Sequence, residues 1–380
     1  LLNIKTVAER RENMLWFRAP EKVYIKKGCL PVALDELRTV RGAKKAFIVT
    51  DNFLYENGYT KPITDKLDEM GIAHTTFFDV QPDPTLKNAK EGAKQMAAFK
   101  PDTIIALGGG SAMDCAKAVG ARVAYPKRTV NQLGGKLKVW RKLPTLIAIP
   151  TTAGTGSETT LAAMITDTDT HRKYAIMSFP IIPHYAVLDA SLTYSLPPHL
   201  TASTGVDALT HAVEAYIGRS TTKETRCLAL EATRLVFENV EKAYANGHDH
   251  EARENMLHAA YKAGIAFSKS YVGYIHALAH SLGGKYGTPH GLANAVMMPY
   301  VLESYGKCVH KKLHRLGIAA GVATEEDTPM TGAIKFINAV KELNARMSIP
   351  NKLSGIQKKD IPALAKHAEK EANPLYPVPI

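Results

Sequence analysis

Five side chains in the second half of the chain have the chemistry of transition-metal ligands. Asp207 and His211 are four residues apart, as are His276 and His280, and His290 follows a Gly-Thr-Pro turn. Residues four apart on a helix share one face, so the two residues of each pair lie on the same face of a predicted helix. A carboxylate with imidazoles and no cysteine fits a divalent metal such as Fe²⁺ or Zn²⁺. About four protein ligands suffice, and spacing leaves open which of the three later histidines is spare.

Two glycine-rich turns in the first half suit a phosphate-bearing cofactor. The first, Gly108–Gly110, joins an apolar run to a helix start, where Ser111 and Asp114 fit a capping box. Glycines let the backbone approach a phosphate, and a helix N-terminus favours negative charge. The second turn, P-T-T-A-G-T-G-S-E at residues 150–158, offers hydroxyls and backbone donors after another apolar run. Either turn alone has the pattern of an ordinary tight turn, but the two together favour a dinucleotide site.

Asp51 ends the apolar run that begins at Lys45. A carboxylate at the end of a strand beside a dinucleotide accepts hydrogen bonds from the ribose hydroxyls and repels a 2′-phosphate, which predicts NAD rather than NADP. The alternative is that Asp51 is simply the N-cap of the helix that follows.

The elements that position these residues change in character near residue 195. Before it, apolar strands at 45–50, 74–78, 103–107 and 145–149 alternate with helical patterns at 60–70 and 85–99. This order predicts a mostly parallel sheet with helices on both faces. After it, helices are predicted over 199–217, 223–245, 250–268, 272–283, 292–305, 308–318 and 329–346. We therefore expect an α/β dinucleotide-binding domain at 1–195 and an all-helical metal-binding domain at 196–380.

Composition excludes several classes of protein. The net charge is +12, but the basic residues are spread along the chain and no nucleic-acid motif accompanies them, so we expect no nucleic-acid partner. No apolar run is long enough for a transmembrane helix, so we expect no membrane partner. The four cysteines are far apart and predict free thiols in a reducing cytoplasm. The chain begins Leu-Leu-Asn without a Met, which we interpret as the sign of an excised domain or of a processed chain.

Four motifs together resemble the iron-dependent (group III) alcohol dehydrogenases over nearly the whole chain. They are G-G-G-S-A-M-D, P-T-T-A-G-T-G-S-E, G-V-D-A-L-T-H-A-V-E-A-Y and H-A-L-A-H-S-L-G-G-K-Y-G-T-P-H-G-L-A-N-A. The resemblance implies a Rossmann-like N-terminal domain, an all-helical C-terminal domain and an active site in the cleft between them. It implies that the metal ligands are Asp207, His211, His276 and His290, and that His280 is a non-ligand facing the substrate. It implies cofactor contacts from Gly109, Gly110, Ser111, Asp114, Thr151, Thr152, Thr155 and, at the cofactor ribose, Lys173.

The first ~110 residues resemble one branch of that family more closely. They are similar to the alcohol dehydrogenase half of the bifunctional aldehyde–alcohol dehydrogenases, just after the interdomain linker. The region between Cys115 and Pro144 is shorter than in that branch, and residues 115–380 look more like the stand-alone members. The chain is therefore interpreted as a divergent natural domain or a chimera joined between about 110 and 145.

The resemblance implies a fermentative, NAD-linked and metal-dependent alcohol dehydrogenase that acts on small primary alcohols such as ethanol. A glycerol or diol dehydrogenase of the same fold is the nearest alternative. A dehydroquinate synthase shares the architecture, but the motif around Asp207 argues against it. A third alternative is an assembly domain of a filament-forming bifunctional enzyme. We expect a homodimer, the commonest symmetry of soluble oligomers, possibly within a larger bifunctional chain.

Overall fold

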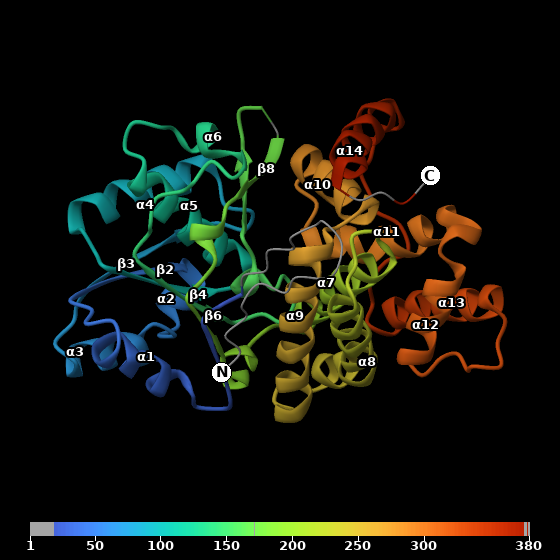
Figure 1. Cartoon of the computed structure of the whole chain (residues 1–380), viewed down its shortest axis with the longest axis horizontal. Coiled ribbons are helices and arrows are strands. Elements are labelled where there is room, and N and C mark those ends of the chain that lie inside the picture. The colour runs from blue at the N-terminus through green and yellow to red at the C-terminus, as the bar shows by residue number, and fades with distance from the viewer. Residues whose placement is uncertain (1–18, 171, 376–377, 379–380) are drawn as a thin grey trace, which may run out of the picture. The chain divides into compact units, whose positions relative to one another are not determined.

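The computed structural model describes residues 19–170, 172–375 and 378, and divides into two compact units (Figure 1). The first unit comprises Leu1–Thr151 and Ser157–Leu192, and the second comprises Thr152–Gly156 and Thr193–Ile380. Residues 1–18, the start of the segment of ~110 residues that resembles the bifunctional branch, lie outside the described residues. Each unit is considered by itself below.

The first unit contains a six-stranded sheet in which every pairing is parallel, in the order β1-β9-β6-β4-β2-β3. The strands are β1 (Lys22–Ile25), β2 (Lys45–Asp51), β3 (Ala73–Val80), β4 (Thr103–Gly108), β6 (Thr145–Pro150) and β9 (Tyr185–Leu188). The four strands predicted from apolar runs are β2, β3, β4 and β6, and the parallel α/β class is confirmed.

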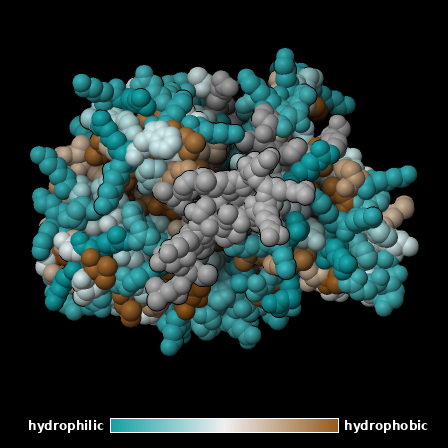
Figure 2. Space-filling model, in the orientation of Figure 1, coloured by the Kyte–Doolittle hydropathy of each residue, from teal (hydrophilic) through white to brown (hydrophobic). Residues whose placement is uncertain are grey.

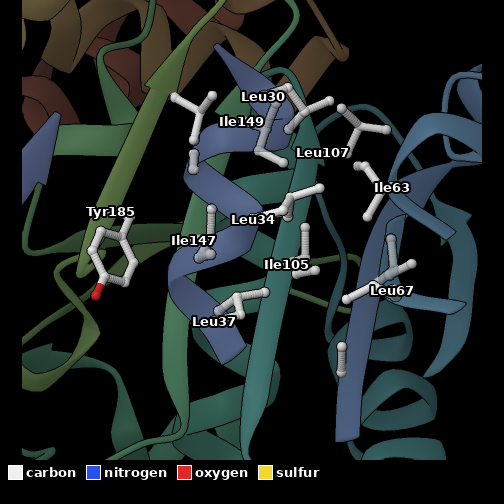
Figure 3. Packing of buried hydrophobic residues seen from close by; sticks show 14 of the residues in the cluster. Leu30, Leu34, Leu37, Ile63, Leu67, Ile105, Leu107, Ile147, Ile149 and Tyr185 are labelled. Carbon is white, nitrogen blue, oxygen red and sulfur yellow. The ribbon is translucent and has the colours of Figure 1, made fainter. Parts of the chain in front are cut away.

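Both faces of this sheet are buried. On one face, Ile105 and Ile147 pack with helices α1 (Leu30–Thr39) and α3 (Lys61–Glu69), as Figure 3 shows. On the other face, Ile104 and Leu146 pack with α4 (Leu86–Phe99) and α5 (Gly110–Ala124). Successive strand residues point to opposite faces, so a strand covered on both sides reads as a continuous apolar run. That is why these short strands were visible in the sequence.

The sheet has a topological switch point between β2 and β4. From β2 the chain runs to β3 on one side, then returns to form β4 on the other side of β2. Ligands of doubly wound sheets bind outside the carboxyl ends of the strands at such a point. The two strands end at Asp51 and Gly108, which places the acidic residue and the first glycine turn at the expected position.

A second sheet of three strands was not predicted from the sequence. It has the order β5-β8-β7 and consists of β5 (Gly135–Lys136), β7 (Ala162–Asp167) and β8 (Arg172–Met177). Its strands are short and carry polar residues such as Thr166 and Lys173, so they lack the apolar runs that mark the main sheet.

The second unit is helical, as predicted. Its helices are α7 (Pro198–Ile217), α8 (Lys223–Ala245), α9 (His250–Ser270), α10 (Tyr274–Tyr286), α11 (His290–Tyr305), α12 (His310–Ala319), α13 (Pro329–Arg346) and α14 (Ile361–Leu375). The seven predicted helices correspond to α7 through α13. Helix α14 was not predicted, yet it packs on α10, in the segment that carries two of the candidate histidines.

On the face drawn in Figure 2, hydrophilic residues predominate around the grey atoms, and hydrophobic residues form separate patches between them. Within the described ranges, no helix combines the length and apolar character of a membrane span. In the part of the chain that the structure describes, Cys29, Cys115, Cys227 and Cys308 form no disulfide, as predicted.

Candidate functional site

Three helices of the second unit bring a carboxylate and two imidazoles together. Asp207 lies on α7, His276 on α10, and His290 is the first residue of α11, directly after Pro289. One ligand atom from each of the three lies within 4.8 Å of the others. The Nε2 atoms of His276 and His290 are each 3.7 Å from Asp207 Oδ1. Three of the predicted ligands therefore form a group of metal-site size.

Close packing of α11 against α7 makes this convergence possible. A Cβ on Gly291 would lie 2.5 Å from the backbone oxygen of Ser203, a distance that side chains do not adopt. Glycine at this position lets the first turn of α11 approach α7, and so brings His290 toward Asp207.

Two fully buried residues that the sequence analysis missed hold this group in place. The carboxylate of Glu214 accepts from His276 Nδ1 at 2.6 Å and from the backbone N–H of Ile275 at 2.8 Å. The Asn294 amide donates to Asp207 Oδ1 at 2.6 Å. Helical spacing could have pointed to both residues in the sequence. Glu214 is seven residues after Asp207, and Asn294 is four residues after His290, so each lies on the same helix face as a predicted ligand. A carboxylate on Nδ1 leaves Nε2 as the atom that meets a metal.

The donor set fits a divalent cation. Among the described residues, His276 Nε2 is buried without a hydrogen-bond partner. A buried polar atom left unsatisfied costs about 1–3 kcal/mol, and a cation beside Asp207 would remove that cost. Burial acts to lower the pKa of His276, but the hydrogen bond and charge of Glu214 outweigh it and raise the pKa. Nitrogen and carboxylate ligands without sulfur suit Fe²⁺ or Zn²⁺.

His211 lies beside this group. Its ring stacks on Phe267 with centroids 4.2 Å apart, and its Nδ1 is 4.0 Å from Asp207 Oδ2. Burial, followed by the charge of His276, holds the pKa of His211 well below its usual value, so the ring is neutral as a ligand must be. Its membership in the ligand set stays a prediction.

His280 lies one helical turn after His276. Its ring stacks on that of His290, with centroids 5.1 Å apart and planes 13° apart. Its Nδ1 is 2.6 Å from Glu371 of α14. The carboxylate that binds His280 Nδ1 therefore comes from a helix outside the motif that contains His276, His280 and His290.

At the switch point of the first unit, the first glycine turn lies beside Asp51. Gly108 has a φ of +145°, and a Cβ there would lie 2.7 Å from the Cβ of Ala112, so the turn requires glycine. Gly109 is the N-cap of α5 and Gly110 its first residue. The Asp51 carboxylate accepts from the backbone of Leu54 at 2.9 Å, so the predicted N-cap is present. The hydrogen bond uses Oδ1 of Asp51. The other carboxylate oxygen, Oδ2, would lie 3.7 Å from a Cβ on Gly108.

The capping box predicted for Ser111 and Asp114 is wrong. Helix α5 has no side-chain cap, because its N-cap is a glycine. Ser111 Oγ instead accepts from the backbone of Asp83 at 3.2 Å. The Asp114 carboxylate accepts from Ser157 Oγ at 2.7 Å and from the backbone of Met164 at 2.9 Å. Asp114 therefore links α5 to the end of the second turn and to β7.

A buried lysine, not singled out from the sequence, secures the same segment. The Lys117 ammonium donates to backbone and hydroxyl oxygens of Ser157 and Thr160 and to the carbonyl of Ala162, at 2.7–3.1 Å. Burial lowers the pKa of Lys117 to about 8, and burial raises the pKa of nearby Glu158 to about 7. In the sequence, this buried role could have been inferred from a lysine that stands among the small apolar residues of α5.

The other predicted cofactor residues divide between the units. Thr151 is buried in the first unit and donates its N–H to the carbonyl of Gly108 at 3.0 Å, joining the two turns. Lys173 is 2.5 Å from the Asp83 carboxylate, which places it near Ser111.

Thr152 and Thr155 belong to the segment Thr152–Gly156, which packs within the second unit. There, a Cβ on Gly154 would lie 2.7 Å from the backbone oxygen of Thr204, so the turn lies close against α7.

Known proteins resemble this chain over both units. A family model for the iron-containing alcohol dehydrogenases matches residues 20–190, and one for the C-terminal region of the same family matches residues 201–378. The chain is 36% identical to the bifunctional aldehyde-alcohol dehydrogenase AdhE of Escherichia coli (strain K12), over 100% of this chain but 46% of that protein. It thus spans about half the length of that relative.

Two further proteins match along most of their own length. The NADPH-dependent butanol dehydrogenase of Clostridium saccharobutylicum is 36% identical, over 90% of this chain and 86% of that protein. The solved structure of a 1,3-propanediol oxidoreductase superposes with a TM-score of 0.90 at 34% identity, over 94% of each chain.

Proposed function

The chain belongs to the iron-containing alcohol dehydrogenase family, and we propose on this premise that it interconverts small primary alcohols and aldehydes with NAD(H), ethanol and acetaldehyde foremost. The observation that carries the proposal is the group of Asp207, His276 and His290, in which Glu214 keeps His276 Nε2 directed at the carboxylate. The similarity to the aldehyde-alcohol dehydrogenase of Escherichia coli supports ethanol as the first substrate to test.

Asp207, His211, His276 and His290 would hold the metal, with Fe²⁺ the first candidate and Zn²⁺ the second. When bound, the cation supplies Lewis-acid polarisation of the substrate oxygen, and the nicotinamide supplies the hydride acceptor. Glu214 holds the proton on Nδ1 of His276, and Asn294 orients the Asp207 carboxylate.

The dinucleotide would lie at the carboxyl ends of β2 and β4, against Gly109, Gly110 and Ser111. Asp51 would accept from its ribose hydroxyls and disfavour a 2′-phosphate, which supports NAD. The similarity to an NADPH-dependent butanol dehydrogenase makes NADP the alternative.

His280 would relay the substrate proton. In the direction of oxidation, the hydroxyl proton of the alcohol passes to His280 Nε2 and then to water, while Nδ1 stays bound to Glu371. Replacement of His280 by Ala is expected to slow turnover and leave the metal bound.

The test combines metal content with NAD⁺-linked oxidation of ethanol and butanol, before and after chelation and after Fe²⁺ or Zn²⁺ is added back. Activity that disappears on chelation and returns with one ion supports the proposal and identifies the ion. Tight metal binding without hydride transfer to any alcohol would contradict it.

A diol dehydrogenase is the second candidate, favoured by the similarity to 1,3-propanediol oxidoreductase. The ratio of kcat/KM for 1,3-propanediol and ethanol distinguishes the two. We further propose a cytoplasmic homodimer, which sedimentation at several concentrations would distinguish from a filament.

A further inference from the structure

Among the described side chains, the helix α14 contacts the histidine-bearing helix α10 through three polar pairs. Tyr274 bonds to Asn373, Ser281 Oγ lies 3.0 Å from His367 Nδ1, and His280 Nδ1 lies 2.6 Å from Glu371 Oε1. Only the last of these pairs involves a residue to which the proposed function gives a role in proton transfer. The other two pairs join the same helices and so provide internal controls.

We propose that Glu371 is a positioning residue for His280: its carboxylate accepts the Nδ1 proton and thereby keeps Nε2 free to take the proton of the substrate hydroxyl. The inference rests on the proposed function, because it assumes that His280 relays that proton.

The need for such a partner follows from the geometry of the ring. Stacking on His290 fixes the plane of the His280 ring. A 180° rotation about the Cβ–Cγ bond returns the ring to the same plane, and so preserves the stacking, but exchanges Nδ1 with Cδ2 and Nε2 with Cε1. A carboxylate at one edge distinguishes the two orientations and also selects the tautomer, because an ionised carboxylate only accepts.

The helix α10 therefore carries two histidines, each with its Nδ1 2.6 Å from a carboxylate of another helix. His276 is bound by Glu214 of α7, whose side chain is fully buried. His280 is bound by Glu371 of α14, whose side chain is 29% exposed. Because Glu371 is partly exposed, its replacement disturbs the buried interior less than replacement of Glu214 would. Glu371 therefore gives a testable variant.

The experiment uses the full chain loaded with Zn²⁺ and compares Glu371→Gln with His367→Gln, which removes a neighbouring contact between the same helices. A glutamine both donates and accepts, so it no longer selects one tautomer. We expect Glu371→Gln to lower kcat about tenfold or more, within the ~10²–10⁴-fold that general acid–base catalysis contributes. KM and zinc content should change less than twofold, and His367→Gln should keep kcat within about twofold of the wild type.

A second readout does not depend on activity. Nitrogen NMR of ¹⁵N-histidine-labelled protein should show His280 protonated at Nδ1 alone in the wild type and a mixture of tautomers in Glu371→Gln. In a His280→Ala background, Glu371→Gln should cause no further loss of kcat.

An unchanged tautomer and kcat in Glu371→Gln, or an equal loss of kcat in His367→Gln, would overturn the inference. If His280→Ala turns over at the wild-type rate, the proposed relay fails and the inference fails with it. The NMR signal then still reports whether the contact exists.

Discussion

The α/β unit and the helical unit both gather polar groups at one place, but with different parts of the chain. In the α/β unit, Gly108–Gly110 follow one strand, and backbone groups carry much of the proposed recognition. In the helical unit, Asp207, His276 and His290 come from three helices and act through side chains. The first arrangement depends on a local turn, whereas the second depends on packing between distant segments. Substitutions should therefore separate cofactor binding from metal binding.

The largest effect is expected where a proposed ligand is removed. Asp207→Ala should weaken metal binding by at least ~100-fold, more than the ~10–100-fold typical when only a partner of a ligand is lost. Alcohol oxidation should be lost with it, while binding of NADH by the α/β unit remains. Metal analysis after dialysis and NADH fluorescence measure the two.

The matched control is His258→Gln, a histidine of α9 outside the group. Equal loss of metal in both variants, or full retention of metal in Asp207→Ala, would contradict the assignment.

Glu214→Gln should have a smaller effect on the same unit. Glu214 uses both oxygens, one for His276 Nδ1 and one for the Ile275 N–H, and a glutamine has only one. His276 then loses the partner that keeps Nε2 available, and metal affinity should fall by ~10–100-fold. Competition with a chelator of known affinity measures it.

Glu238→Gln is the control, because it removes one negative charge from an exposed position of α8. Wild-type metal affinity in Glu214→Gln would show that the hydrogen bond to His276 is not needed for ligation.

Asp51→Asn tests the α/β unit without disturbing its local structure. Asparagine preserves an acceptor for the Leu54 N–H that caps α2 (Asn52–Glu56) but removes the charge. The preference for NAD over NADP should fall about tenfold, equivalent to ~1.4 kcal/mol. Ratios of kcat/KM for the two cofactors measure this, and metal content should not change. If the ratio of kcat/KM for NAD and NADP does not change, Asp51 caps α2 but does not select the cofactor.

The two units also differ in how far sequence predicted them. Ile105 and Ile147 lie in strands buried on both faces, so apolar runs gave the sheet and its parallel class. Periodicity predicted the helices of the second unit. The motifs predicted Asp207, His211, His276 and His290 as ligands, and three of these four lie together in the structure. Glu214, Lys117 and Glu371 were missed because each depends on which helix or loop packs against it, and sequence spacing carries little of that. Helix α14 was missed entirely, and with it the partner of His280.

We also expect the stability of the α/β unit to depend on pH through Glu158. Burial raises its pKa to about 7 from a usual value of 4.5. Between these values the folded protein holds a proton that the unfolded chain has released, so the free energy of unfolding falls as pH rises and levels off above about 7. Glu158→Gln lacks this titration, so its stability relative to the wild type should increase from pH 5 to pH 7.5, by on the order of 1–3 kcal/mol. Urea unfolding at both pH values measures the difference, with Glu36→Gln of α1, whose side chain is 17% exposed, as a variant at a different carboxylate. A relative stability that is flat or falls with pH would mean that Glu158 is ionised throughout, held so by the Lys117 ammonium, and that the α/β unit contains a buried ion pair of these two residues.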